Sequence, residues 1–138
     1  MDVLYTATAH ATGDGRNGHA TSDDGILDLD LRIPKAMGGP GGATNPEQLF
    51  AAGYAACFHS ALKVVAGRQQ ADVTGSEVSA SVGIGTTPGG GFGLQVELDV
   101  SIPALDRDAA LALVEQAHQV CPYSNATRGN IEVTLTVV

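Results

Sequence analysis

Two cysteines, Cys57 and Cys121, are the residues of this sequence most able to carry out redox chemistry. They stand far apart in the chain, and in the cytoplasmic location expected below thiols stay reduced. A static structural disulfide is not expected there, whereas a transient redox pair is possible. The reactive form of a cysteine is the thiolate, so the question is what surrounds each sulfur.

Cys57 lies in the longest apolar stretch of the chain, residues 45–67 (NPEQLFAAGYAACFHSALKVVAG). Asn45 is expected to cap a helix and Pro46 to occupy its first position. At about 100° per residue, the face that carries Cys57 also carries these residues: Phe50, Gly53, Tyr54, Ala61 and Val64. Burial on an apolar face raises a thiol pKa, and the helix N-terminus is about 18 Å away, too far for its dipole to help. A reactive Cys57 therefore needs a cation from another segment.

Several cations could fill that role, and residue types alone do not choose among them. Arg16 is displayed on a glycine-rich turn at 12–18, but nothing in its own segment ranks it above Arg32, Lys63 or Arg128. The histidines do not predict a metal site, because none is spaced from another ligand as a helical pair would be.

Composition limits the classes of function. With 138 residues, 43% hydrophobic and 16% charged, the chain is expected to form one globular domain, 1–138. Its net charge of −8 argues against binding nucleic acid or an anionic membrane surface, both of which require clustered Lys and Arg. Neither a signal peptide nor a membrane span is recognised, so a cytoplasmic location is expected.

Alternating residues predict the strands that position these groups. Strands are expected at 3–10, 19–22, 27–33, 77–84, 92–102 and 131–137, with Arg32 facing water and the strands at 77–84 and 92–102 forming an antiparallel hairpin. The glycine-rich loop 34–44 lacks the ending of a phosphate-binding loop.

A second helix is expected from about Asp106 to Cys121, where Pro122 ends it. Its expected buried residues are Ala109, Leu111, Leu113, Val114 and Ala117, while Glu115, Gln116 and His118 face water.

This order of elements gives an α+β fold with helices packed on largely antiparallel sheet. The helix at 45–67 is apolar around nearly its whole circumference, and one sheet can cover only one side of it. We therefore expect its other side to meet a second subunit.

Three segments together resemble the organic hydroperoxide resistance proteins, a branch of the OsmC superfamily. They are NPEQLFAAGYAACF at 45–58, VCPYSNATRGNIEV at 120–133 and the Asp-Gly-Arg turn at 14–16. The likeness extends over the whole chain and implies an OsmC-like intertwined homodimer.

The resemblance also implies an activity, a thiol peroxidase that reduces organic hydroperoxides, including those of lipids, without a bound cofactor. Cys57 would be the peroxidatic cysteine and Cys121 the resolving cysteine, with Arg16 and Glu47 as their polar partners. Lipoyl groups on proteins would supply the electrons. Phe50, Tyr54 and Phe92 would line the substrate pocket.

Distance along the helix adds an expectation about the dimer. Glu47 precedes Cys57 by about 15 Å on one straight helix, so one arginine cannot easily reach both within a subunit. We expect a composite site in which Glu47 of one subunit serves Cys57 of the other, with Arg16 held by Glu47 through a bidentate pair.

Two other functions remain open at this point. One is the OsmC type of peroxidase with a different substrate preference, which the relative turnover of organic and hydrogen peroxide would separate. The other is a non-catalytic binding or redox-sensing module, which would give a single stoichiometric burst instead of steady turnover. Acyl hydrolase chemistry is disfavoured because no histidine base is evident near Cys57.

Overall fold

Two three-stranded sheets, one in each half of the chain, organise the fold in the computed structural model, which describes residues 1–138. The chain forms two units, Met1–Leu49 and Phe50–Val138. The boundary falls within the first turn of helix α1 (Pro46–Gln69), and each unit is described by itself. A single domain over 1–138 stays a prediction.

The first unit is built on an antiparallel sheet of β1 (Ala9–Thr12), β2 (His19–Ser22) and β3 (Asp28–Asp30). Two short 3-10 helices, η1 (Gly15–Asn17) and η2 (Lys35–Met37), lie in the connections.

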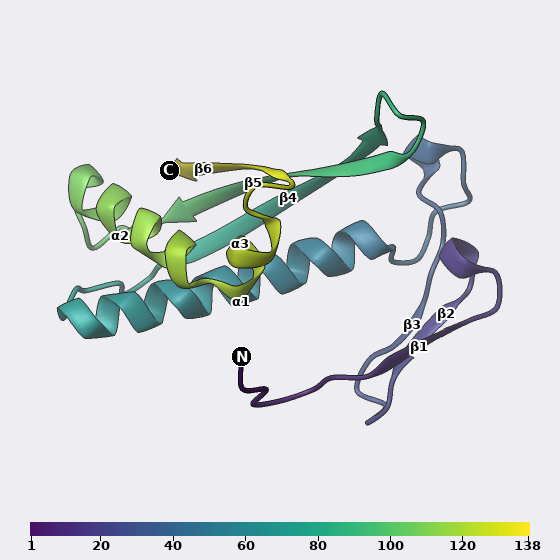
Figure 1. The fold of residues 1–138 in the computed structure, drawn as a ribbon, viewed down its shortest axis with the longest axis horizontal. Helices are drawn as coiled ribbons and strands as arrows, with labels where there is room; N and C mark the ends of the chain where they lie inside the picture. The colour runs from purple at the N-terminus through teal and green to yellow at the C-terminus, as the bar shows by residue number, and fades with distance from the viewer. The chain divides into compact units, whose positions relative to one another are not determined.

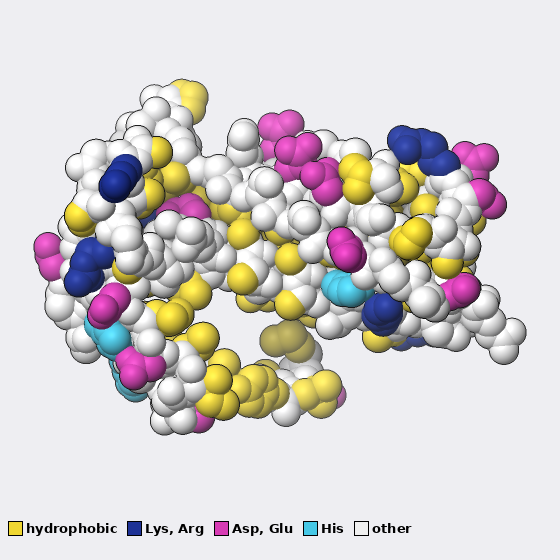
Figure 2. Space-filling view, turned by 180° about the vertical axis from the view of Figure 1, so that it is seen from behind, with side chains coloured by type: hydrophobic (Ala, Val, Ile, Leu, Met, Phe, Trp, Pro, Cys, Tyr) yellow, Lys and Arg dark blue, Asp and Glu magenta, His cyan; other side chains and the backbone are white.

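The predicted first strand at 3–10 is wrong in extent, because β2 pairs only with residues 9–12 and residues 1–8 have no partner strand in the chain. The apolar side chains of Val3, Leu4 and Tyr5 are consequently exposed, and Figure 2 shows a run of hydrophobic side chains along this segment.

The predicted strand at 27–33 is also shorter in the structure, and Arg32 does not face water as expected. After β3 only an isolated bridge joins Leu31 to Thr44. The Arg32 guanidinium donates to the backbone carbonyls of Leu31 (2.6 Å), Gly18 (3.2 Å) and Asn17 (3.3 Å). A guanidinium carries five donors, and here one of its nitrogens closes the turn after η1.

The second unit contains α1, a long hairpin of β4 (Glu77–Thr86) and β5 (Phe92–Ser101), and the helices α2 (Arg107–Val120) and α3 (Pro122–Thr127). The hairpin is antiparallel, as predicted. The final strand, β6 (Glu132–Val137), pairs with β5 in parallel, because a helical crossover rather than a tight turn joins the two. The α+β class with largely antiparallel sheet is therefore confirmed, with one parallel pair.

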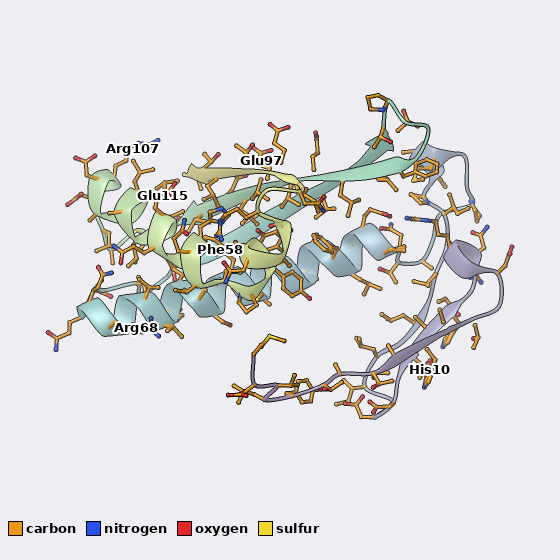
Figure 3. The ribbon with its side chains drawn as sticks, viewed as in Figure 1. His10, Phe58, Arg68, Glu97, Arg107 and Glu115 are labelled. Atoms are coloured by element: carbon orange, nitrogen blue, oxygen red, sulfur yellow. The ribbon has the colours of Figure 1, made fainter.

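The helices of the second unit lie against one face of the β4–β5–β6 sheet (Figure 1). The core comprises residues of both layers, among them Tyr54, Phe58, Leu62, Leu98, Val100, Val114 and Cys121, all fully buried or nearly so. Figure 3 places Phe58 in this packed layer and Glu97 on the opposite face of the sheet.

Helix α1 is long and apolar enough to cross a membrane by length and composition. Its residues Tyr54, Phe58, Leu62 and Val65 nevertheless lie in the core, and a core helix passes the same test. Val64, expected on the face that carries Cys57, is 51% exposed.

The buried stripe of α2 is Ala110, Leu113, Val114 and Ala117, at helical spacing. Ala109 and Leu111 are exposed, so the predicted set was wrong at these two positions. The Asp106 carboxylate caps the helix by accepting from the Ala109 N–H at 2.9 Å, which sets the first turn of the helix. His118 is half-buried rather than turned to water, and its Nδ1 is buried without a hydrogen-bond partner.

Candidate active site

Arg16 is presented by a turn that depends on glycine. Gly13 and Gly15 have φ of +74° and +54°, in the left-handed region that favours glycine. At Gly18 a Cβ atom would meet the Thr12 carbonyl oxygen at 2.2 Å. The backbone of this turn is therefore fixed by residue type, and Arg16 is held at the middle of η1.

The predicted bidentate pair between Arg16 and Glu47 is present. Arg16 Nη1 donates to Glu47 Oε2 and Nη2 donates to Oε1, both at 2.7 Å. The Glu47 side chain is only 12% exposed, whereas that of Arg16 is 36% exposed. Two parallel charge-assisted bonds fix the plane of the guanidinium and leave its remaining donors available to another group.

The helix start positions Glu47. The Asn45 side chain accepts from the Gln48 N–H at 2.9 Å, so the expected cap is confirmed, and Pro46 begins α1. Hydrogen bonds from Arg16 hold the pKa of Glu47 below its usual value, and the same pair raises the pKa of Arg16. Both groups are thus held in their charged forms.

The two cysteines meet in the second unit. Cys57 Sγ and Cys121 Sγ lie 3.8 Å apart, and both are free thiols. Cys57 is half-buried and Cys121 is fully buried. A disulfide requires about 2.05 Å between sulfurs, so closing this one needs an approach of about 1.8 Å.

Cys121 forms the elbow between α2 and α3. Its φ of −64° and ψ of 123° are extended, as expected for a residue before proline. Its N–H donates to the Ala117 carbonyl at the end of α2, and its carbonyl accepts from the Asn125 N–H in α3, both at 2.9 Å. The predicted end of the second helix at Cys121 is therefore confirmed, while α3 itself was not predicted.

Burial raises the pKa of the Cys57 thiol above its ordinary value of 9.0, and a hydrogen bond from the Tyr123 backbone N–H opposes this shift. Cys121, the nearest ionisable neighbour, adds to the rise. This agrees with the expectation that Cys57 on its own helix face is a weak acid and depends on a cation supplied from outside that face.

Three aromatic rings adjoin the cysteines. Phe50 and Tyr54 meet edge-on with centroids 6.0 Å apart, and Tyr123 lies 5.8 Å from Phe50 and 5.6 Å from Tyr54. Tyr123 was not named as a site residue, although the Cys-Pro-Tyr-Ser run could have pointed to it. Phe92 is 73% exposed at the start of β5, opposite Thr86, and is not part of this cluster.

Tyr54 is a core residue, and its hydroxyl lies 2.9 Å from Ser124 Oγ and 3.1 Å from Thr127 Oγ1. This buried network was missed, because recognising it requires knowing that α3 packs on α1.

The structure brings together no group of three His, Cys, Asp or Glu side chains suited to a metal ion. His59 Nε2 lies 3.0 Å from Ser76 Oγ.

Of the predicted site residues, the structure thus forms two pairs, Arg16 with Glu47 in the first unit and Cys57 with Cys121 in the second. The catalytic roles of these four residues, and the composite site across two subunits, stay predictions.

This constellation can be compared with known proteins. The family profile described as OsmC-like protein matches residues 39–136. The chain therefore belongs to the OsmC family, in its organic hydroperoxide resistance branch.

Two curated relatives illustrate the likeness. The organic hydroperoxide resistance protein of Xanthomonas axonopodis pv. citri is 58% identical over 98% of this chain and 95% of its own length. The organic hydroperoxide resistance protein OhrB of Bacillus subtilis is 50% identical over 96% of this chain and 97% of its own length.

A solved structure shares the fold closely. The crystal structure of an organic hydroperoxide resistance protein from Elizabethkingia anophelis, with thiocyanate bound, aligns with a TM-score of 0.95 and 55% identity, covering 99% of this chain and 98% of that one.

Proposed function

We propose that this protein is a cysteine-based peroxidase that reduces organic hydroperoxides, including lipid hydroperoxides, to alcohols. The observation that carries the proposal is the pair of free thiols 3.8 Å apart, one on α1 and the other at the α2–α3 elbow, in a chain of this family. Relatives named for organic hydroperoxide resistance support the choice of substrate class.

The chemistry proceeds in three balanced steps. The Cys57 thiolate attacks the distal oxygen of ROOH, the O–O bond breaks, and the products are Cys57–SOH and an alkoxide that takes a proton to become ROH. The Cys121 thiol then attacks the sulfenic sulfur, forming the Cys57–Cys121 disulfide and releasing water. A lipoyl dithiol reduces this disulfide by exchange and becomes a lipoyl disulfide.

Arg16 and Glu47 supply the charge in this proposal. The guanidinium stabilises the Cys57 thiolate and the oxygen that leaves, because it stays protonated throughout. Glu47 is a positioning residue that fixes the guanidinium plane through its two bonds of 2.7 Å. Burial raises the pKa of Cys57, and no cation of its own chain is among the groups that shift this pKa, so the proposal assigns that role to Arg16.

The site is composite and belongs to a homodimer. Arg16 and Glu47 pair within one chain, and Glu47 lies about 15 Å along α1 from Cys57 of the same chain. We therefore expect the Arg16–Glu47 pair of one subunit to serve Cys57 of the other. Exposed apolar residues such as Leu4, Tyr5 and Val64 support the presence of a second subunit.

Phe50, Tyr54 and Phe92 form the apolar lining for the organic group of the substrate. Phe50 and Tyr54 are in contact within the aromatic cluster, while Phe92 is exposed in one chain and would complete the lining in the dimer. The protein uses no bound cofactor and works in the cytoplasm, with a lipoylated protein as its electron donor.

A steady-state peroxidase assay with cumene hydroperoxide and dihydrolipoamide tests the function, using the parent protein, Cys57→Ser and Cys121→Ser. We expect turnover in the parent only, and a sulfenic acid that accumulates in Cys121→Ser. Activity retained in Cys57→Ser would refute the proposal. A single stoichiometric burst from the parent would instead indicate a redox sensor.

A further inference from the structure

Helix α3 is seated on α1 directly beside the thiol pair. Gly53 of α1 makes room for it, since a Cβ atom there would meet the Tyr123 hydroxyl oxygen at 2.9 Å. The Tyr123 ring can therefore lie against the helix, and the first turn of α3 approaches α1 closely.

The next residue of α1, Tyr54, holds α3 through buried hydroxyl groups. Its Oη lies 2.9 Å from Ser124 Oγ and 3.1 Å from Thr127 Oγ1. Tyr54 and Ser124 are 0% exposed and Thr127 is 3% exposed. No solvent competes for these bonds, so each is stronger than it would be at the surface, and an unmade one would be costly.

The protons of this cluster are ordered. Thr127 donates its only hydroxyl proton to the carbonyls of Tyr123 (2.9 Å) and Ser124 (3.2 Å). Its oxygen must therefore accept from Tyr54, which leaves the Tyr54 oxygen to accept from Ser124. The hydroxyl chain runs from Ser124 through Tyr54 to Thr127 and ends on the α3 backbone, with every proton used.

The hydroxyl chain and the thiol pair lie next to each other, because their residues follow the same three-residue spacing on both segments. On α1, Tyr54 precedes Cys57 by three residues, and after the elbow Ser124 and Thr127 follow Cys121 at successive intervals of three. Residues three apart share a helix face and are about 4.5 Å apart along the axis. Tyr54 thus contacts Ser124 and Thr127 about one turn from the point where Cys57 meets Cys121.

We propose that the Ser124–Tyr54–Thr127 hydroxyl chain is a positioning device that holds the resolving thiol of Cys121 in place to capture the Cys57 sulfenic acid. The inference rests on the proposed function and adds three positioning residues to it. In the capture step the Cys121 sulfur displaces hydroxide from the Cys57 sulfenic sulfur, the S–S bond forms, and the thiol proton leaves in the water produced. That step needs the two sulfurs about 1.8 Å closer than their present 3.8 Å. Since Cys121 immediately precedes α3, the position of α3 on α1 determines how readily the two sulfurs can approach, and so the rate of disulfide closure.

Arg128 also connects α2 to the end of α3, through hydrogen bonds at the surface, and these can be compared with the buried bonds of the hydroxyl chain. Arg128 Nη2 donates to the His118 carbonyl of α2 at 2.5 Å, and Nη1 donates to Asn125 Oδ1 at 2.8 Å. This arginine is exposed, so water replaces its bonds at little cost. The buried hydroxyl chain is therefore the stronger constraint on Cys121.

Tyr54→Phe is the most direct test, because it keeps the ring that lines the aromatic cluster and removes only the hydroxyl. Ser124 would then hold a buried donor without an acceptor, which favours displacement of α3 toward water. We expect disulfide closure, measured from the sulfenic acid once it has formed, to slow about tenfold. Because Tyr54 also lines the proposed substrate pocket, the rate of sulfenic acid formation is measured separately, and Thr127→Val, a change outside that pocket, should leave it unchanged. A longer-lived sulfenic acid meets more peroxide, so overoxidation to the sulfinic acid should rise in proportion.

Thr127 provides a matched pair of variants. Thr127→Val removes the hydroxyl at nearly constant volume and should slow closure as Tyr54→Phe does. Thr127→Ser keeps the hydroxyl and should close at nearly the parental rate. Val100→Ala, a core change on β5, controls for stability and should lower the melting temperature without altering closure.

The experiment mixes each reduced protein with one equivalent of cumene hydroperoxide to measure closure and, in a second series, with an excess that supplies the second oxidation. Sulfenic acid is trapped with dimedone at successive times, and the sulfenic, sulfinic and disulfide forms are quantified by mass spectrometry. Equal closure rates in the parent, Tyr54→Phe and Thr127→Val would overturn the inference and leave the proposed function standing. If the parent itself forms no Cys57–Cys121 disulfide, the proposed function fails instead. Slowed closure in Val100→Ala to the same degree would assign the effect to general loosening and also overturn the inference.

Discussion

The Arg16–Glu47 pair and the Cys57–Cys121 pair are held by different kinds of structure. Arg16 is on a surface turn shaped by glycines, and charge-assisted hydrogen bonds fix it. The cysteines lie among packed helices, where burial and apolar side chains fix them. A guanidinium keeps its charge when it is partly exposed to water, whereas a half-buried thiol has its pKa raised by burial, so the two pairs depend on different physical interactions.

This contrast implies that the stability of the second unit depends mainly on the packing of its buried apolar side chains. Phe58→Ala should lower the free energy of unfolding by about 3–5 kcal/mol, because Phe58 is fully buried and its removal leaves a cavity. Urea titration followed by circular dichroism measures the change, which should be nearly independent of salt. Leu111→Ala on the exposed face of α2 is the control and should cost far less. A small effect of Phe58→Ala would mean that packing does not hold the thiol unit.

The first unit, in contrast, should contribute mainly to reactivity. Arg16→Ala should lower the rate constant of Cys57 with cumene hydroperoxide by about 10²–10³-fold, the effect of removing one preorganised hydrogen-bond donor from a reacting centre. Stopped-flow kinetics measure it, with Arg68→Ala at the exposed end of α1 as the control. An Arg16→Ala protein as unstable as Phe58→Ala would contradict the division of roles.

Glu47→Gln tests whether the Arg16–Glu47 pair acts through its charge. It keeps the shape but loses the charge that orients Arg16, and we expect about a tenfold fall in the rate constant. The folded pKa of Glu47 is depressed, so the pair stabilises the protein fully above the ordinary value of 4.5. This stabilisation is lost as pH falls through the depressed pKa.

Unfolding measurements across the acid range should therefore show the parent and Glu47→Gln converging in stability below the pKa of Glu47. A constant difference between them at all pH values would show that Glu47 acts by packing rather than by charge.

The smallest predicted change in stability concerns His19 on the sheet of the first unit. Both nitrogens of its ring face carboxylates. Nδ1 lies 2.8 Å from Asp30 Oδ1, and Nε2 contacts Asp28; Figure 2 shows histidine beside acidic side chains in this region. The carboxylates raise the pKa of His19 above 6.5. The pair thus stabilises the unit fully below pH 6.5 and ceases to do so as pH rises through the raised pKa.

Melting temperatures of the parent and His19→Gln should accordingly differ slightly at pH 6 and converge in alkali, and NMR titration of the ring gives the pKa itself. His10→Gln on neighbouring β1 is the control. A His19 ring that titrates at or below 6.5 would contradict the contact with both carboxylates.

Sequence periodicity predicted the elements whose pattern is local. The cap at Asn45, helix α1 and the β4–β5 hairpin follow from short-range residue spacing, and all three are present. The direction of β6 was not predicted, because alternation of apolar and polar residues does not distinguish parallel from antiparallel pairing. The helix expected between the strands at 92–102 and 131–137 was the available signal, since such a crossover can join parallel strands. Strand 3–10 failed because its length depends on a partner, which only β2 supplies and only for four residues.

The residues of the candidate site also differ in whether local sequence or distant packing determines their contacts. The resemblance named both cysteines, Arg16 and Glu47 as site residues, and their roles stay a prediction. The bidentate pair expected between Arg16 and Glu47 is present. The buried contacts of Ser124 and Thr127 with Tyr54 could not be predicted from residue type, since serine and threonine in a short helix normally face water. Their spacing of three from Cys121 was the available signal, and it has meaning only once α3 is known to lie on α1.

The parallel pairing of β5 and β6 has a consequence for how the protein folds. The β4–β5 hairpin joins neighbouring segments and can form quickly, whereas β6 must close a loop that includes both α2 and α3 before it can pair. Cys121 lies inside that loop, and its contact with Cys57 also joins segments that are distant in the chain, 64 residues apart. The contact between the two thiols and the pairing of β6 with β5 should therefore both form later than the local β4–β5 hairpin, because each must first close a long loop.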